Sequence, residues 1–177
     1  MKISELYENF SPNKVYIHGG PSKLEGGHFK RGGRKGHDMG ALFFIEESDA
    51  GYKYALGYAS GNDTGIFRVN IQLNPNDIFD FTRSDHKKIA KEFLNPQEYK
   101  SWEQSKGDSG HIDWAVIDEE IIEDMGFKGA MIHERNAGQI SKDSIVSVAI
   151  FDPKYTKIIG FIPKKDAMEK FGKTSIM

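Results

Sequence analysis

Short hydrophobic runs, each bounded by glycine, proline or polar residues, are the clearest pattern in the chain. Residues 15–17 and 42–44 form continuous apolar runs of the kind found in buried strands. Between residues 66 and 73 apolar and polar side chains alternate, which predicts a half-buried strand. Further runs at 130–133, 145–151 and 157–162 predict three more strands.

Helical patterns lie between these strands. Ser48 is a suitable N-cap for a helix that runs to about Ser60 and ends at Gly61. Pro163 starts a basic C-terminal segment in which a short helix is expected. Strands that are separated irregularly by hairpins and helices indicate an α+β fold and not a doubly wound parallel sheet.

Besides a helical stretch that includes Tyr99 and Trp102, two more helices are expected in the middle of the chain. Ser84 is a suitable cap for one that Asn95-Pro96 closes, and its apolar positions are Ile89, Phe93 and Leu94. The other ends at Gly126, with the acidic run at 118–124 as its solvated face. Its apolar positions are Trp114, Ile117, Ile121 and Ile122. Near its start we expect capping and surface groups, and not metal ligands, at His111, Asp113 and Asp118.

Length and composition narrow the class of protein. The 177 residues suit a single domain, with a core at about 14–160 and a basic C-terminal tail at 163–177. The absence of cysteine excludes disulfides, thiol catalysis and Cys-ligated zinc. A formal net charge of -2 argues against a globally basic nucleic-acid binder. Since no apolar run of membrane-spanning length and no signal-peptide pattern occurs, we expect a cytoplasmic protein without a membrane partner.

The first candidate for chemistry is His18, which follows the first apolar run and precedes Gly19 and Gly20. A neutral imidazole offers one donor and one acceptor, so it can hold a ribose hydroxyl. Two glycines let the backbone approach a ligand closely, and the Gly19 backbone offers both partners of a carboxamide. The alternative is a hydrogen-bonded histidine at the end of a strand.

The second candidate is an aromatic pair. Phe43 lies in the apolar run 42–44, and Tyr54 lies one turn or so into the helix that Ser48 caps. The two rings are spaced so that they could hold a flat ring between them, each contact contributing on the order of 1 kcal/mol beyond area burial. The alternative is that both rings belong to the core.

The glycine-rich segment between Gly19 and Gly40 is basic and includes Arg31 and Arg34. We interpret it as a mobile loop over a cleft, where its amides and arginines meet the pyrophosphate of a nucleotide or the phosphates of an acceptor. A solvated surface loop is the alternative. The segment matches neither a Walker loop nor a Rossmann fingerprint. The six histidines show no metal-ligand spacing, so no metal is expected.

The order and spacing of these motifs resemble a known family. His18-Gly19, a variable glycine-rich stretch, the strand that contains Phe43, and then Tyr54 in the following helix are similar to the NAD-binding core of ADP-ribosyltransferases. The resemblance is to the diphtheria-toxin and poly(ADP-ribose) polymerase type, and most to the domains found in phage and polyvalent proteins. Residues 124–132 and 145–153 resemble later elements of that core, so the resemblance covers about residues 14–160.

This resemblance implies a split β-sheet core with peripheral helices, which binds NAD as a substrate in a cleft between two small sheets. It also implies roles for single residues. His18 would bind the nicotinamide ribose and Gly19 the carboxamide, with Phe43 and Tyr54 stacking on the nicotinamide ring.

One position departs from the family pattern. The family's glutamate, which orients the ribose and stabilises the developing oxocarbenium, falls on Ser147. Serine cannot supply that charge, and a preorganised group of this kind is worth roughly 3 kcal/mol. Either another residue substitutes, with Glu134 and Gln139 as candidates, or the chain binds NAD and transfers ADP-ribose slowly or not at all.

The expected function is therefore an NAD-dependent ADP-ribosyltransferase, a glycosyltransferase that modifies a protein or nucleic-acid acceptor. We expect a monomer, acting in the host bacterial cytoplasm during host takeover if a phage encodes it. Two alternatives are a catalytically inactive nucleotide-binding or partner-binding module on the same fold, and a phage host-interaction protein that uses the basic loop as its contact surface.

Overall fold

The computed structural model describes residues 10–29, 40–134 and 145–172 of the chain. They form an α+β structure with mostly antiparallel strands, as the pattern of runs predicts. The chain divides into two compact units. Unit 1 comprises Met1–Ser11 and Leu73–Phe151, and unit 2 comprises Pro12–Gln72 and Asp152–Met177. Each unit has its own strands and its own helices, and each is described separately.

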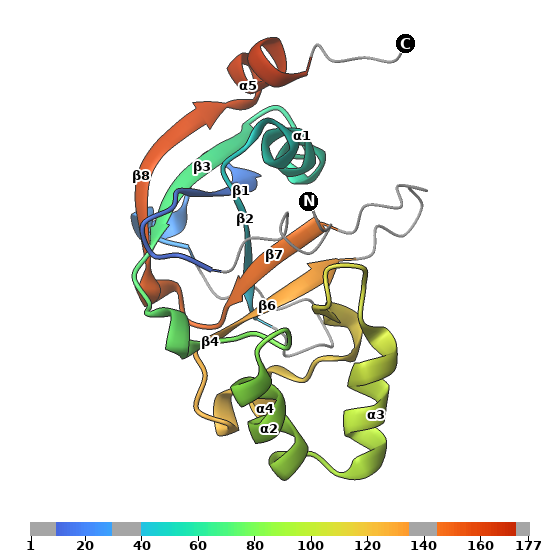
Figure 1. The fold of residues 1–177 in the computed structure, drawn as a ribbon. Helices are drawn as coiled ribbons and strands as arrows, with labels where there is room; N and C mark the ends of the chain where they lie inside the picture. Colours follow the sequence, from blue (N-terminus) through green and yellow to red (C-terminus); the bar gives the residue numbers. More distant parts are fainter. Residues whose placement is uncertain (1–9, 30–39, 135–144, 173–177) are drawn as a thin grey trace. The chain divides into compact units, whose positions relative to one another are not determined.

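The sheet of unit 2 is antiparallel, in the order β2-β1-β3-β8 (Figure 1). Its strands are β1 (Tyr16–Pro21), β2 (Leu42–Glu46), β3 (Thr64–Ile71) and β8 (Thr156–Pro163). All four strands lie where the hydrophobic pattern predicts them, within about two residues at each end, except that β1 continues four residues beyond the apolar run 15–17, to Pro21. The pairing of β3 with β8 shifts by one residue between Arg68 and Val69, which marks a β-bulge.

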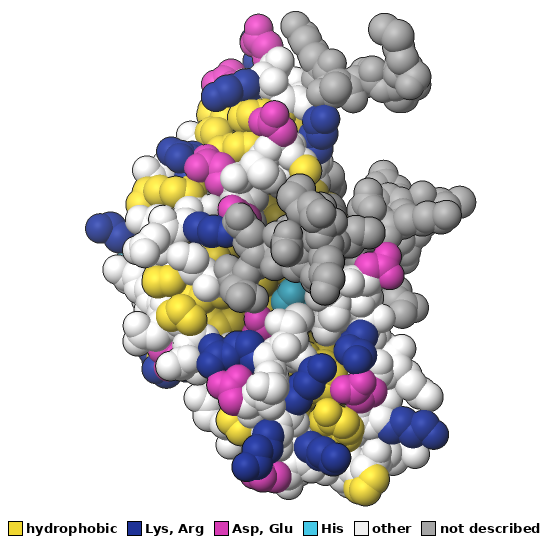
Figure 2. Space-filling view, in the orientation of Figure 1, with side chains coloured by type: hydrophobic (Ala, Val, Ile, Leu, Met, Phe, Trp, Pro, Cys, Tyr) yellow, Lys and Arg dark blue, Asp and Glu magenta, His cyan; other side chains and the backbone are white. Residues whose placement is uncertain are grey.

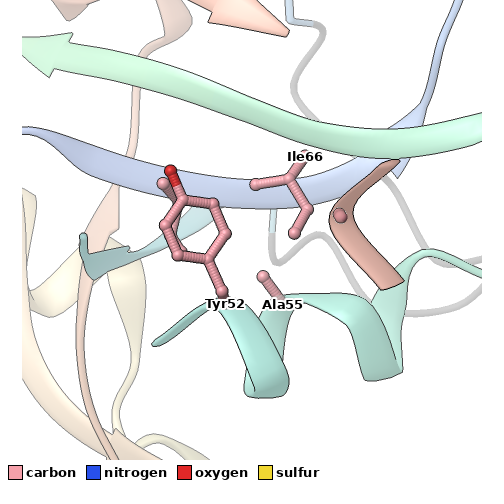
Figure 3. Close-up of a cluster of buried hydrophobic side chains, with 5 residues drawn as sticks. Tyr52, Ala55 and Ile66 are labelled. Carbon is pink, nitrogen blue, oxygen red and sulfur yellow. The ribbon is translucent and has the colours of Figure 1, made fainter. Parts of the chain in front are cut away.

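Two helices pack on one face of this sheet. Helix α1 (Asp49–Tyr58) has the predicted N-cap, since the Ser48 hydroxyl accepts from the Gly51 amide at 3.0 Å. Helix α5 (Lys164–Phe171) follows β8. Tyr52 and Ala55 point from α1 toward the strands (Figure 3). The buried cluster consists of Ile17, Tyr52, Ala55, Ile66 and Ala167, and the ring of Phe171 stacks on Tyr52 with centroids 3.9 Å apart.

The sheet of unit 1 is mixed. Strand β6 (Gly129–Glu134) pairs antiparallel with β7 (Ile145–Ile150). The other edge of β6 pairs in parallel with two short strands, β4 (Ile78–Phe79) and β5 (Ile112–Asp113). Helices α2 (Ser84–Phe93), α3 (Pro96–Ser105) and α4 (Glu119–Asp124) complete the unit. Aromatic rings fill its core, with Phe79 within 6.2 Å of Phe81, Trp102 and Phe127.

Helix α2 differs from the prediction in its cap and in its buried face. Arg83 occupies the N-cap position, and Ser84 is the first helical residue. The buried positions are His86 and Ala90, whereas Ile89 and Phe93 are 37% and 51% exposed. Residues four apart share a helix face, so both pairs satisfy the helical period, and tertiary packing selects the smaller pair.

The prediction of an amphipathic helix that ends at Gly126 is wrong about the length of the helix. Residues 112–117 form β5 and a short 3-10 turn, and the helix begins only at Glu119. Asp113 and Asp118 are capping residues as expected, because their carboxylates accept from the amides of Ala115 and Glu120. His111 is not a surface group, since it is 1% exposed.

The visible face of α2 and α3 mixes lysine and arginine with acidic and hydrophobic side chains (Figure 2). It therefore lacks the single-sign charge of a nucleic-acid binding surface. In the part of the chain that the structure describes, no helix has both the length and the apolar character needed to cross a bilayer.

Candidate functional site

The imidazole of His18 is fixed by a backbone carbonyl. Its Nδ1 atom lies 2.7 Å from the carbonyl oxygen of Phe43 on the neighbouring strand β2. Because a carbonyl can only accept, Nδ1 must carry the proton and donate. In the neutral ring this leaves Nε2 as the atom with acceptor character, which suits a hydroxyl donor such as that of a ribose.

Two backbone hydrogen bonds show which neighbouring strand the N–H and C=O groups of Gly19 point toward. The Glu47 amide donates to the Val15 carbonyl at 2.9 Å, and the Ser22 amide donates to the Asp63 carbonyl at 2.8 Å. In an antiparallel sheet the backbone groups of successive residues turn to opposite neighbours. The odd-numbered residues of β1 therefore turn their N–H and C=O groups toward β2, and Gly19 is one of them.

The ladder between β1 and β2 ends before it reaches Gly19. In this ladder Tyr16 pairs with Glu46, and Ile17 pairs with Ile45. In that register Gly19 would stand opposite Phe43, whose carbonyl accepts from His18. The Gly19 backbone thus directs one donor and one acceptor toward β2 beyond the last paired position. A primary carboxamide needs that combination of groups.

Aromatic rings surround His18 on its side of the sheet. Its ring centroid lies 5.2 Å from Phe29 and 5.4 Å from Phe44, and Phe29 also contacts Phe67 at 5.3 Å. Phe29 is 6% exposed, although it lies in the glycine-rich segment for which the sequence predicts a mobile or a solvated loop. These aromatic contacts restrict the orientation of the imidazole ring.

The predicted stacking residues lie on the other side of the sheet. Phe43 shares its face of β2 with Ile45, which packs against the cluster beneath α1. Tyr54 lies on α1 and is partly buried, and its hydroxyl is 2.9 Å from that of Tyr58. The two tyrosine rings are 5.0 Å apart at their centroids. A role for Phe43 and Tyr54 in stacking on a ligand stays a prediction.

One charged group of unit 2 is not predicted by the sequence. Arg68 on β3 forms a bidentate ion pair with Glu47, at 2.6 Å and 2.8 Å, and the Tyr52 hydroxyl also donates to Glu47. The hydrogen bond from Arg68 lowers the pKa of Glu47. Burial, together with the bond to Glu47, raises the pKa of Tyr52 to about 12. The group joins β3 to the start of α1, and no spacing rule connects these three residues in advance.

Ser147 and Glu134 are brought together in unit 1. The Ser147 hydroxyl donates to the Glu134 carboxylate, with Oγ 3.0 Å from Oε1. Ser147 is 2% exposed and Glu134 is partly buried. The other candidate for the missing carboxylate, Gln139, lies outside the described residues, as do Arg31 and Arg34 of the glycine-rich segment.

A second set of buried polar groups lies elsewhere in unit 1. His111 Nε2 is 3.4 Å from an Asp80 carboxylate oxygen, and His133 Nε2 bonds to the Ser105 carbonyl. Neither ring nitrogen of His111, nor Nδ1 of His133, has a hydrogen-bond partner among the described residues. Burial lowers the pKa of His111, Asp80 opposes that shift, and His133 adds to it. In the described ranges no three such side chains are grouped closely enough to hold a metal.

Comparisons with known proteins give no relative for this chain: no protein-family model, no curated protein and no solved structure matches it.

Proposed function

We propose that this protein is an NAD-dependent ADP-ribosyltransferase, in which His18 and Gly19 hold the nicotinamide end of the substrate. The observation that carries the proposal is the position of Gly19 on β1, beyond the residues of β1 that pair with β2. There the Gly19 backbone offers a donor and an acceptor past the last pair with β2, beside an imidazole oriented by the Phe43 carbonyl. A nicotinamide riboside presents a matching carboxamide and ribose hydroxyls.

In the reaction, the bond between nicotinamide N1 and ribose C1′ breaks, and its electron pair leaves with nicotinamide. Positive charge develops on the ribose, and a lone pair of the acceptor forms the new bond to C1′ while the acceptor loses a proton. With water as acceptor the products are nicotinamide, ADP-ribose and one proton. His18 Nε2 would accept from a ribose hydroxyl throughout, which holds the sugar while the charge develops.

His18→Asn is the substitution that tests this role. The Asn amide nitrogen takes a place similar to Nδ1 and can still donate to the Phe43 carbonyl, whereas the acceptor at Nε2 is lost. We expect nicotinamide release from labelled NAD to fall about 100-fold, which corresponds to losing one hydrogen bond of 2 to 3 kcal/mol in the transition state. His28→Asn, at an exposed position, is the matched control and should retain wild-type release.

The assay uses purified protein with labelled NAD, first in buffer and then with a bacterial lysate as a source of acceptors. Label that becomes attached to protein or nucleic acid with wild type, and not with His18→Asn, identifies the acceptor class. Wild-type protein that neither releases nicotinamide nor transfers label would contradict the proposal.

A second candidate function is a nucleotide-binding module without transfer, and the uncharged, buried Ser147 favours it. Titration calorimetry with NAD separates the two functions. Binding by wild type together with no nicotinamide release supports the binding module, and turnover supports the enzyme.

A further inference from the structure

A row of side chains crosses β2, β1, β3 and β8 on the face of unit 2 that carries His18. His18 pairs with Phe67 of β3, and Phe67 pairs with Phe161 of β8. On its other side, the register of β1 against β2 brings His18 opposite Phe44. Residues that stand opposite each other on neighbouring strands share a face. The imidazole is therefore the one polar side chain in a row with three phenylalanines, and its two neighbours in that row are buried.

Phe29 covers this row from outside the strands. Its ring centroid lies 5.2 Å from that of His18, 5.7 Å from Phe44 and 5.3 Å from Phe67, so one ring contacts side chains of three adjacent strands. The interplanar angles are 78°, 76° and 77°, which is the edge-to-face geometry that aromatic rings prefer. Because protein interiors are close-packed, the buried ring of Phe29 fills the space into which the imidazole would otherwise rotate.

A glycine turn places Phe29 at this position. Gly26 and Gly27 have φ angles of 74° and 75°, a region that residues with a side chain rarely adopt. The Gly27 amide donates to the Leu24 carbonyl at 3.0 Å, which closes the turn. The chain leaves β1 after Pro21, and the turn brings it back so that Phe29 lies against a side chain of that strand.

The imidazole has one orientation that suits it to bind a hydroxyl group. Nδ1 donates to the Phe43 carbonyl at 2.7 Å, which leaves Nε2 as the acceptor. The Nε2 edge of the ring lies beside Gly20, since a Cβ atom at that position would be 3.5 Å from Nε2. Rotation of the ring would carry Nδ1 away from the carbonyl. The rings of Phe29 and Phe44 oppose that rotation.

We propose that Phe29 is a positioning residue for His18, and that its ring confines the imidazole to the orientation in which Nδ1 donates to Phe43 and Nε2 is presented to the ribose hydroxyl. This inference rests on the proposed function. Phe29 is 6% exposed and acts through His18, so it is not itself a contact of the substrate. All of the residues involved belong to unit 2.

The first test is a double-mutant cycle on nicotinamide release by the full chain. Phe29→Ala should lower kcat/KM about tenfold, the order of one aromatic contact, because the imidazole is kept but is no longer confined. In the His18→Asn background the same substitution should have no further effect, since the ring through which Phe29 acts is missing. A second tenfold loss in the double variant would show that Phe29 does not act through His18.

The second test reads the orientation of the ring without substrate. In protein labelled with 15N in its histidine rings, the nitrogen chemical shifts show which nitrogen of a neutral imidazole carries the proton. At pH 8 wild-type His18 should be the Nδ1–H tautomer, assigned by the loss of its signals in His18→Asn. Phe29→Ala should give a mixture that includes the Nε2–H tautomer, because the carbonyl no longer holds Nδ1. An unchanged tautomer would overturn the proposal.

Phe81→Leu is the matched control, because Phe81 is a buried phenylalanine of unit 1 that packs on Phe79 and Trp102. It should lower the stability to urea and leave kcat/KM and the His18 tautomer unchanged. An equal loss of kcat/KM in this control would mean that the effect of Phe29 is a general loss of stability. If Phe29→Ala does not fold, Phe29→Leu replaces it. Leucine keeps much of the buried volume without the ring, so kcat/KM should fall about threefold.

The outcomes separate the two proposals. If Phe29→Ala matches wild type in kcat/KM while His18→Asn is inactive, the role of Phe29 is wrong and the proposed function stands. If wild-type protein does not release nicotinamide, the proposed function fails, and the kinetic role of Phe29 fails with it. The tautomer measurement then decides whether Phe29 orients the ring of His18.

Discussion

Gly19→Ala is expected to lower the free energy of unfolding by about 3 kcal/mol, the upper end of what overpacking usually costs. A Cβ atom at Gly19 would lie 2.1 Å from the carbonyl oxygen of Ala55, far inside van der Waals contact. The oxygen belongs to the backbone of α1, so no side-chain rotation relieves the clash. The helix would have to move away from β1 as a whole.

Gly20→Ala is the matched control for this substitution. A Cβ atom at Gly20 would have the His18 ring as its nearest neighbour, at 3.5 Å, which is ordinary contact. Its unfolding free energy should stay within about 0.5 kcal/mol of wild type. Urea unfolding followed by circular dichroism measures both variants. Equal stability of the two would mean that α1 does not lie against β1 at Gly19.

The second large effect is a loss of stability as the pH falls below 6.5. Burial lowers the pKa of His111 in the folded protein, and it also lowers that of His86. Between the folded and unfolded pKa values the unfolded chain binds more protons, so stability rises with pH in that window. For each buried histidine, the free energy of unfolding falls by at most about 1.4 kcal/mol per pH unit as the pH drops below 6.5.

Charged groups near these histidines also shift their pKa values, some in the same direction as burial and some against it. Asp80 faces His111 and favours its charged form, whereas His133 on β6 disfavours it. Around His86, Arg83 disfavours the charged form, and Asp85 and Asp80 favour it. The net direction for both histidines is a lowered pKa, so acid destabilises unit 1.

Urea unfolding at pH 7.5, 6.5, 6.0 and 5.5 measures this slope. His111→Phe should reduce it and leave the part due to His86, whereas His28→Asn, at an exposed position, should not change it. A wild-type stability that is constant or higher at pH 5.5 would show that Asp80 compensates for the charge on His111.

The sequence predicts the strands well because their signal is local. Alternation along β3 and the apolar runs of β1, β2 and β8 depend on which face each residue buries, and that is a short-range pattern. The cap of α1 at Ser48 is equally local, since the hydroxyl bonds to an amide three residues away.

The features that the sequence does not predict depend on long-range packing. Residues 112–117 leave the helical pattern because β5 pairs with β6, and this pairing is invisible in a local window. Phe29 is a lone aromatic in a polar segment, so no periodicity marks it as part of the core. The bond between Ser147 and Glu134 depends on the register of β6 against β7, and the position of Gly19 beyond the paired residues depends on where β1 and β2 stop pairing. The sequence therefore offers His18 and Gly19 as candidates, but it does not give the geometry around them, and it does not indicate Phe29 as a neighbour of His18.

The division of the chain into segments also bears on how it is synthesised. Unit 1 uses no residue after Phe151, so all of its residues are synthesised before those of β8 and α5. The sheet of unit 2 must wait for those last elements, because β3 has β8 as a neighbour and the cluster beneath α1 includes Ala167. While translation continues, β3 presents an unpaired hydrophobic edge, which is the condition under which nascent chains aggregate or require a chaperone.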